Sequence, residues 1–207
     1  MSGSSESKAA LVTGGSRGVG EGIEVGLAEA GWTVHFSGRS ERRLARTAER
    51  VTQAGGRAVS HVCDHADEAA VQGLVRAVEE ADGAIDLLVN NVWAGPQFNP
   101  FAPERFWERP LDDWDSLITV GLRAHYVAAH AAVPAMIRHG SGLIVNVSSV
   151  GARKHLHSTL YGMGKAALDK MTHDMAVELR GTGVSVLSLW PGLVRTKLLL
   201  ASGLKEF

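Results

Sequence analysis

Short runs of apolar, mostly β-branched residues alternate along this chain with longer stretches in which apolar residues recur every three or four positions. The short runs have the length of strands, and the longer stretches have the period of amphipathic helices. Two runs, IDLLVN and GLIVNVS, are apolar almost throughout, which is typical of parallel strands covered by helices on both faces. The pattern predicts an α/β fold, a doubly wound parallel sheet whose six strands are expected at 8–13, 32–37, 57–63, 85–90, 142–148 and 184–190.

Two segments stand out from this alternation. Residues 112–139 place apolar side chains at helical spacing and predict one long helix, with a possible bend at Pro134. Residues 95–111 contain three prolines ahead of Pro110 and are expected to form a loop. Aromatic side chains in and before this loop could line a pocket for an apolar substrate or pack into the core, and both remain open: Trp93, Phe98, Phe101, Phe106 and Trp107.

Length and charge narrow the classes of function. A chain of 207 residues, 45% of them hydrophobic, suits one domain, so we expect a disordered lead at 1–7 and a single domain at 8–207. The net charge of −1, with Lys and Arg scattered, argues against nucleic acid or a membrane surface as partner. No apolar run is long enough to span a bilayer, the N-terminus lacks the apolar core of a signal peptide, and Cys63 is the only cysteine. A cytoplasmic protein with a small-molecule partner is expected.

A glycine-rich turn follows the first predicted strand. Gly14, Gly18 and Gly20 stand between an apolar run and a helical stretch, where glycines let the backbone approach a dinucleotide pyrophosphate at a helix N-terminus. Arg39 follows the second predicted strand, at a position where a site for NAD(H) would usually offer Asp or Glu to the ribose. With Arg17 inside the turn, two guanidinium groups could bind a 2′-phosphate, which favours NADP(H) over NAD(H). The alternatives are a glycine turn of purely structural origin and two solvated arginines.

A tyrosine and a lysine share one face of a predicted helix. Tyr161 and Lys165 are four residues apart, so their side chains project together. A nearby ammonium stabilises the phenolate and is expected to lower the pKa of the phenol from about 10, which suits a proton donor to a carbonyl oxygen. Ser149, at the end of an apolar strand, could hold that oxygen, and Ser148 is the neighbouring alternative because strand side chains alternate. We choose Ser149.

With the segments NNVWAG and WPGLVRT, these motifs make residues 8 to about 200 resemble the short-chain dehydrogenase/reductase family, in its single-domain Rossmann branch. The resemblance implies three catalytic residues, Ser149, Tyr161 and Lys165. It also implies that Asp64 faces the adenine and that residues after the fourth and sixth strands border the nicotinamide ribose and ring. The cofactor-binding residues expected from it are Gly14, Ser16, Arg17, Gly18, Val19, Gly20, Arg39, Asp64, Asn90, Ala94, Gly95, Tyr161, Lys165, Pro191, Gly192, Val194 and Thr196.

Three features depart from the family's usual pattern. The turn NNVWAG is longer than the usual Asn-Asn-Ala-Gly and inserts Trp93, and Gly121 stands where the family commonly has an Asn that helps to hold a relay water. These features resemble the subgroup of mammalian dehydrogenase/reductase member 1, in which the Gly is normal. The chain stops at Phe207, before the family's lid and seventh strand, so we expect either a truncated chain or a curtailed six-stranded form.

The function expected from the sequence is an NADP(H)-dependent oxidoreductase that interconverts a ketone or aldehyde and an alcohol. The rival is a catalytically lapsed dinucleotide sensor or scaffold, which Gly121 and the short C-terminus suggest. A homodimer or homotetramer is expected through the 112–139 helix and the helix after Tyr161. No metal is expected, because His61, Cys63 and His65 lack a fourth ligand, and His155 and His157 are interpreted as surface residues rather than substrate contacts.

Overall fold

The described part of the chain forms a sheet of six parallel strands in the order β3-β2-β1-β4-β5-β6, which confirms the predicted Rossmann architecture. The structure is a computed structural model and describes residues 8–94, 105–197 and 200. Each strand lies within two residues of its predicted position. The strands are β1 (Ala9–Val12), β2 (Thr33–Gly38), β3 (Arg57–Val62), β4 (Leu87–Asn90), β5 (Gly142–Val147) and β6 (Val184–Leu189).

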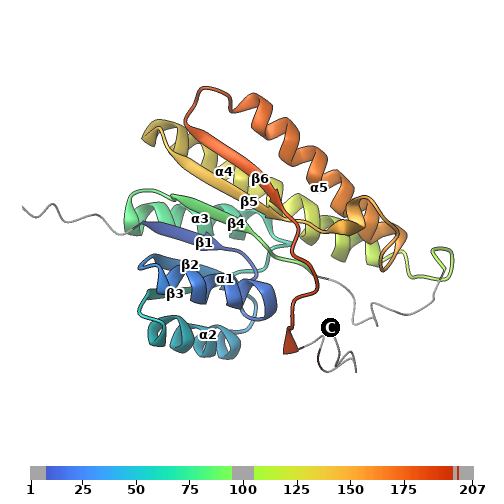
Figure 1. The fold of residues 1–207 in the computed structure, drawn as a ribbon, viewed down its shortest axis with the longest axis horizontal. Helices are drawn as coiled ribbons and strands as arrows, with labels where there is room; N and C mark the ends of the chain where they lie inside the picture. Colours follow the sequence, from blue (N-terminus) through green and yellow to red (C-terminus); the bar gives the residue numbers. More distant parts are fainter. Residues whose placement is uncertain (1–7, 95–104, 198–199, 201–207) are drawn as a thin grey trace, which may run out of the picture.

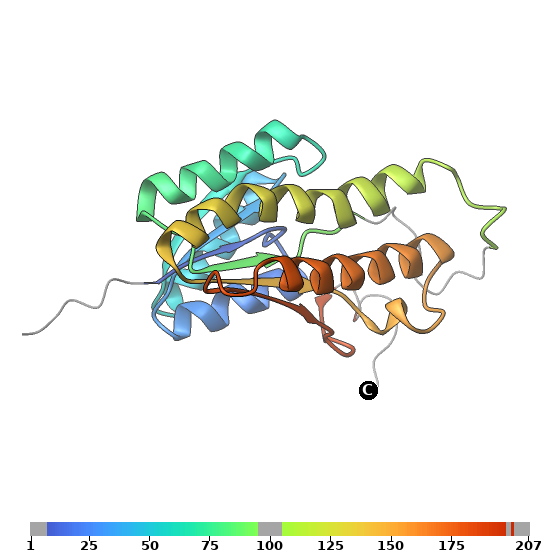
Figure 2. The same cartoon turned by 90° about the horizontal axis from the view of Figure 1, so that it is seen from above.

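Helices cover both faces of the sheet (Figures 1 and 2). α1 (Gly18–Glu29) and α2 (Glu41–Gln53) pack on one face. The other face carries α3 (Glu68–Asp82), α4 (Ala124–His139) and α5 (Thr159–Glu178). None of the helices within the described residues is both long and apolar enough to cross a bilayer.

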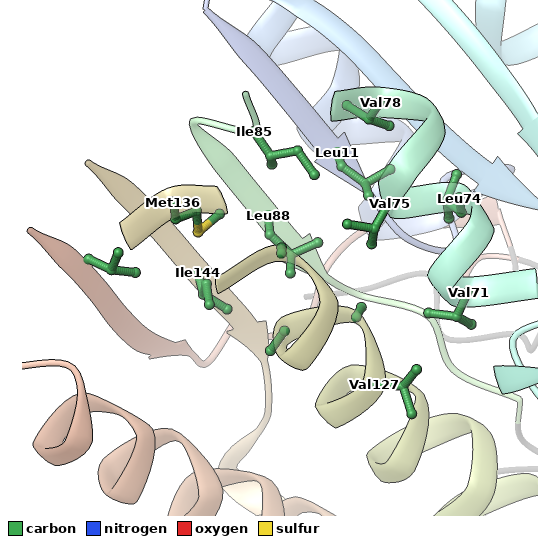
Figure 3. Close-up of a cluster of buried hydrophobic side chains, with 14 of the residues drawn as sticks. Leu11, Val71, Leu74, Val75, Val78, Ile85, Leu88, Val127, Met136 and Ile144 are labelled. Carbon is green, nitrogen blue, oxygen red and sulfur yellow. The ribbon is translucent and has the colours of Figure 1, made fainter. Parts of the chain in front are cut away.

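A hydrophobic core fills the space between the sheet and the second helical layer (Figure 3). Leu11, Leu88 and Ile144 project from three neighbouring strands and are fully buried. Val75 of α3 and Met136 of α4 pack against them. Burial of each such side chain contributes about 1.5–3 kcal/mol, so this core stabilises the packing of α3 and α4 on the strands.

The long helix predicted for 112–139 is present, but most of its first half is π-helical. η1 (Asp115–Arg123) is a π-helix, and α4 continues from it through Pro134 to His139. A π-helix is wider than an α-helix and is frequently found at functional sites. Gly121 lies in this widened segment and is buried.

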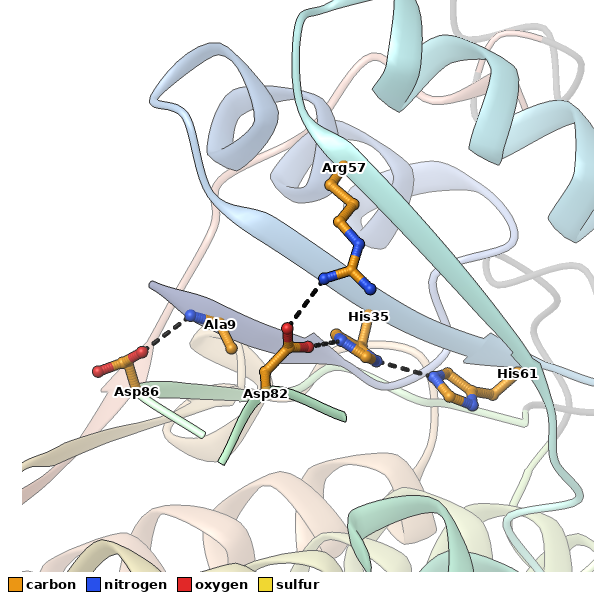
Figure 4. A network of polar contacts seen from close by, with 6 residues as sticks. All are labelled: Ala9, His35, Arg57, His61, Asp82 and Asp86. Carbon is orange, nitrogen blue, oxygen red and sulfur yellow. Dashed lines mark hydrogen bonds and ion pairs between the residues drawn. The ribbon is translucent and has the colours of Figure 1, made fainter. Parts of the chain in front are cut away.

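A polar network ties β2 and β3 to the end of α3 (Figure 4). His35 is fully buried; its Nε2 bonds to Asp82, and its Nδ1 lies 2.9 Å from Nε2 of His61. Asp82 also pairs with Arg57 at 3.0 Å. Burial is the largest cause that lowers the pKa of both histidines, so they are neutral at neutral pH. His61 therefore serves the fold here.

Two glycines in the turn before β6 provide a test of close packing. Gly181 and Gly183 both have left-handed backbones, with φ of 79° and 84°. A Cβ on Gly181 would meet nothing within 4 Å, whereas one on Gly183 would overlap the carbonyl oxygen of Gly140. We expect Gly181→Ala to cost about 1–2 kcal/mol of unfolding free energy from backbone strain. Gly183→Ala should cost about 1–3 kcal/mol more because the turn after α4 must move. Urea unfolding of both variants checks this, and equal losses would contradict it.

Candidate active site

The candidate site lies at the carboxyl ends of β1, β4, β5 and β6. The strand order reverses direction between β1 and β4, and open α/β sheets bind their ligands at such a switch point. The glycine turn after β1, the NNVWAG turn after β4, the serine-tipped end of β5 and the segment after β6 all meet at this edge.

The glycine turn has the backbone that the sequence requires. Gly14 and Gly18 have φ of 71° and 66°. A Cβ on Gly14 would lie 2.6 Å from the Cα of Val92, and a Cβ on Gly20 would lie 2.6 Å from Nδ2 of Asn91, so side chains at either position would collide. The first turn of α1 receives no side-chain cap from its N-cap residue, Arg17. Its N–H groups are therefore available to an anion, and the turn fits a pyrophosphate.

Two residues that sequence reasoning missed hold this turn against β4. Asn91 donates from Nδ2 to the carbonyl oxygens of Thr13 (3.0 Å) and Gly14 (3.1 Å). The Thr13 hydroxyl accepts from the backbone N–H groups of Asn91 and Val92. The available signal was a pair of amide side chains directly after an apolar strand, where buried polar groups need partners.

The other amide of that pair, Asn90, is used inside the fold. Its side chain is fully buried and donates to Oδ1 of Asn146 (3.0 Å) and to the carbonyl of His125 (3.2 Å). If Asn90 contacts the cofactor ribose as predicted, it does so through its backbone atoms, because its side chain is bonded inside the fold. Ala94 closes the described part of the same turn, and Gly95 lies outside the described residues.

Both candidate phosphate-binding arginines, Arg17 and Arg39, are exposed. Ser16, inside the glycine turn, lies against Gly38 at the end of β2, next to Arg39; a Cβ on Gly38 would be 3.1 Å from that of Ser16. Asp64 is exposed and accepts from the N–H of Ala66 at 3.0 Å. The roles of these residues toward a cofactor remain predictions.

The structure brings together the phenol and the serine hydroxyl. The Tyr161 hydroxyl donates to Oγ of Ser149 at 2.9 Å, and that Oγ also accepts from the N–H of Gly151 at 3.0 Å. The alternative serine, Ser148, instead donates to the carbonyl oxygen of Lys165 at 3.4 Å. Of the two hydroxyls, the one on Ser149 therefore lies at the phenol.

Lys165 lies behind the phenol. It is 8% exposed, its Nζ donates to the carbonyl of Val147 at 2.8 Å, and the same Nζ is 5.9 Å from the centroid of the Tyr161 ring. Burial lowers the pKa of Lys165 to about 8, with Asp169 acting in the opposite direction.

The expected fall in the phenol's pKa is not found. Burial raises the pKa of Tyr161, and the hydrogen bond to Ser149 only partly offsets that effect. The spacing of Tyr161 and Lys165 indicates the effect of the ammonium on the phenol, but not the loss of water around the phenol. At neutral pH the phenol is protonated, which suits a proton donor.

Two further side chains contact Tyr161. The His157 ring meets it edge-on with centroids 4.7 Å apart, and the Trp93 ring meets it edge-on at 6.4 Å. His157 has a φ of 66°, which is uncommon for a residue with a side chain. His157 is thus half-buried against the phenol, whereas His155 is exposed as expected.

The predicted aromatic wall is only partly described. Phe106 and Trp107 are each 67% exposed, which excludes core packing for these two. Phe98 and Phe101 lie outside the described residues.

The segment after β6 reaches the glycine turn. A Cβ on Gly18 would lie 3.7 Å from Cγ2 of Thr196, so this segment passes close to the start of α1. The predicted cofactor residues Pro191, Gly192 and Val194 lie in the same segment, before Thr196. Gly192 and Val194 are exposed, and Val19, on α1, is half-buried.

Within the ranges that the structure describes, no group of three or more His, Cys, Asp or Glu side chains is placed to hold a metal ion. His65 is buried, with its Nε2 2.8 Å from Oγ of Ser37, and Cys63 is buried as a free thiol. His61 in β3 and His65 just after it therefore both have partners inside the fold.

Comparison with known proteins gives a consistent result. The family model of short chain dehydrogenases matches residues 8–205. Dehydrogenase/reductase SDR family member 1 of Mus musculus is 45% identical over 199 residues, which cover 95% of this chain and 62% of the mouse protein. The chain thus spans less than two thirds of that relative's length. The predicted resemblance to this subgroup is confirmed.

Two solved structures share the fold. A metagenomic short-chain oxidoreductase in complex with NADP is 34% identical, with a TM-score of 0.82 over 92% of this chain and 85% of that one. A variant of actinorhodin polyketide ketoreductase with NADPH is 29% identical, with a TM-score of 0.84 over 94% of this chain and 74% of that one.

Proposed function

We infer, because this chain belongs to the short-chain dehydrogenase/reductase family of oxidoreductases, that it interconverts a carbonyl compound and an alcohol with NADP(H). One observation carries the proposal. The Tyr161 hydroxyl is hydrogen-bonded to Ser149 at the carboxyl edge of the sheet, near the glycine turn and with Lys165 behind it. A phenol, a hydroxyl and an ammonium so placed can bind a carbonyl oxygen and protonate it.

Each side chain has one role in this proposal. Ser149 holds the substrate oxygen beside the phenol, and Tyr161 donates its proton to that oxygen. Lys165 supports the phenolate left behind and, with hydrogens beyond the one given to Val147, can bind the cofactor ribose. NADPH, when bound, supplies the hydride that reduces the carbonyl carbon. In the reverse direction the phenolate takes the proton of the alcohol.

The residues that would hold the dinucleotide follow the sheet edge. The uncapped first turn of α1 and the glycine turn would bind the pyrophosphate, and Arg17 and Arg39 would bind a 2′-phosphate. Support for NADP(H) comes from these two exposed arginines and from the two similar structures, which contain NADP and NADPH.

The choice of cofactor can be tested at one position. Arg39→Asp should weaken NADPH binding about 10–100-fold, because a charge-assisted hydrogen bond contributes about 1.5–3 kcal/mol. The affinity for NADH should stay the same or increase, since the new carboxylate can accept hydrogen bonds from the ribose hydroxyls. Both dissociation constants are measured by titration. Arg46→Asp, at an exposed position in the second turn of α2, serves as control. An equal loss for both nucleotides would remove the phosphate argument.

Further properties of the protein follow as proposals. The substrate is a moderately apolar ketone or aldehyde, supported by exposed Phe106 and Trp107 and by Trp93 beside the phenol. The chain forms a homodimer or homotetramer, supported by exposed apolar side chains on α4 and α5, among them Tyr126 and Val177. The single cysteine supports a cytoplasmic location.

The activity is tested by following NADPH consumption with a panel of ketones and aldehydes of increasing apolar size. Turnover of any member supports the oxidoreductase. Tight NADPH binding with no turnover of the whole panel would favour the rival hypothesis, a dinucleotide sensor without chemistry.

A further inference from the structure

Gly121 lies where η1 passes Tyr161 and Lys165, here called the catalytic pair. It is buried, and the nearest atom that a Cβ at this position would meet is Cδ1 of Trp93, at 3.5 Å. The two residues are 28 positions apart in the chain and come from different elements. The indole of Trp93 thus occupies the space into which a longer side chain at position 121 would extend.

A small cavity marks the place where these residues meet the catalytic pair. Its volume is about 10 Å³, and it is lined by Trp93, Leu117, Gly121, Tyr161, Gly164 and Lys165. This is room for one water at most. The lining beside Tyr161 and Lys165 is mostly aromatic ring, Leu side chain and glycine, which offer water few hydrogen-bond partners.

The backbone beside Trp93 is held from two sides. His125 Nε2 lies 2.8 Å from the carbonyl oxygen of Val92, which accepts its hydrogen. The N–H groups of Asn91 and Val92 both donate to the hydroxyl of Thr13, at 3.1 and 3.2 Å. His125 is fully buried, and burial lowers its pKa to about 3, so it keeps this neutral donor role at neutral pH. These bonds hold the backbone immediately before Trp93 against β1 and α4.

We propose that Trp93 is a positioning residue that works as a matched pair with Gly121. The indole fills the space beside the glycine, restricts water at the inner side of Tyr161 and Lys165, and holds the phenol ring edge-on in register with Ser149. The inference rests on the proposed function, because it assigns Trp93 to the site at which Tyr161 donates a proton.

The pairing predicts a steric effect at position 121. Gly121→Ala should be tolerated, because a Cβ at 3.5 Å is an ordinary contact. Gly121→Asn should displace the indole, since its outer atoms need the same space. We expect kcat to fall about 10–100-fold, with the Kd for NADPH within about threefold of wild type. Gly73→Asn is the matched control: it replaces a mid-helix glycine of α3, whose Cβ would meet only the end of Arg76 at 3.8 Å.

Removing the indole should relieve part of the kcat defect that Gly121→Asn causes. Trp93→Ala alone should lower kcat, and Trp93→Phe should restore part of it. The double variant Trp93→Ala with Gly121→Asn should turn over faster than Gly121→Asn alone, because the amide then has room. Losses that multiply in the double variant would overturn the proposal, as would a Gly121→Asn enzyme with wild-type kcat.

A measurement independent of turnover separates this inference from the proposed activity. The protein is labelled with fluorotryptophan, and the ¹⁹F resonance of Trp93 is identified by its loss in Trp93→Phe. Gly121→Asn should shift that resonance, and Gly73→Asn should leave it in place. An unshifted resonance would overturn the pairing even in an active enzyme. A shifted resonance in a chain that reduces no carbonyl would retain the pairing and refute the activity.

Discussion

Replacing Tyr161 by phenylalanine is expected to lower kcat for carbonyl reduction by about 10²–10⁴-fold, the usual contribution of a positioned general acid. The substitution removes only the hydroxyl that donates to Ser149 and keeps the ring against His157 and Gly151. The fold and the glycine turn should therefore be unaffected. Steady-state kinetics together with NADPH titration should show a large loss of kcat with little change in the Kd for NADPH.

The chain provides its own control for this substitution, because it has only two tyrosines. Tyr126 is 51% exposed on α4 and lies near His130, outside the site. Tyr126→Phe should retain wild-type kinetics. If Tyr161→Phe kept wild-type turnover, some other group would be the proton donor, and the proposed mechanism would fail.

The second large effect concerns Glu24, a carboxyl group buried in α1 beneath the glycine turn. It is fully buried, and neither oxygen has a hydrogen-bond partner among the described residues. A Cβ on Gly15 would collide with this carboxyl. Burial, with a smaller contribution from the charge of Glu21, raises the pKa of Glu24 to about 10. The folded protein therefore carries Glu24 protonated at neutral pH.

Stability should fall with rising pH on account of this group. Below the unfolded pKa of 4.5 both states are protonated, and Glu24 has no effect on the pH dependence. Above it the unfolded chain releases a proton that the folded chain retains until about pH 10, so each pH unit costs about 1.4 kcal/mol. Glu24→Gln, which cannot ionise, should gain about 4 kcal/mol over wild type between about pH 5 and about pH 8.

Urea unfolding across that pH range measures the gain. Glu29→Gln makes the same substitution at an exposed position at the end of α1 and should leave the wild-type slope unchanged. Parallel pH profiles for wild type and Glu24→Gln would show that the carboxyl is ionised or solvated in the folded protein.

Several parts of the site could be predicted from the local pattern of residues in the sequence. The six strands, their parallel pairing and the position of the glycine turn were all predicted, because apolar periodicity and backbone freedom depend on neighbouring residues. Tyr161 and Lys165 could be placed on one face of a helix because the spacing of four residues fixes that geometry. The choice of Ser149 over Ser148 was made in advance but depended on strand register, which a one-residue slip would have reversed.

Other parts could not be predicted in this way. The inward hydrogen bonds of Asn90, the contact between His157 and Tyr161 and the π-helical turn around Gly121 each depend on segments that meet only in the folded chain. The direction of the Tyr161 pKa is the clearest case, because the sequence contained the lysine but not the loss of solvent that outweighs it.

The order of residues was thus enough to decide the fold class, the phosphate-binding turn and the helical face that carries the phenol, because each is a property of residues within one turn or one strand. Packing alone decided which serine lies at the phenol, how far the phenol is removed from water, and that the indole of Trp93 lies against Gly121. These depend on distances between segments far apart in the chain, and the long-range burial that sets them has no local signature.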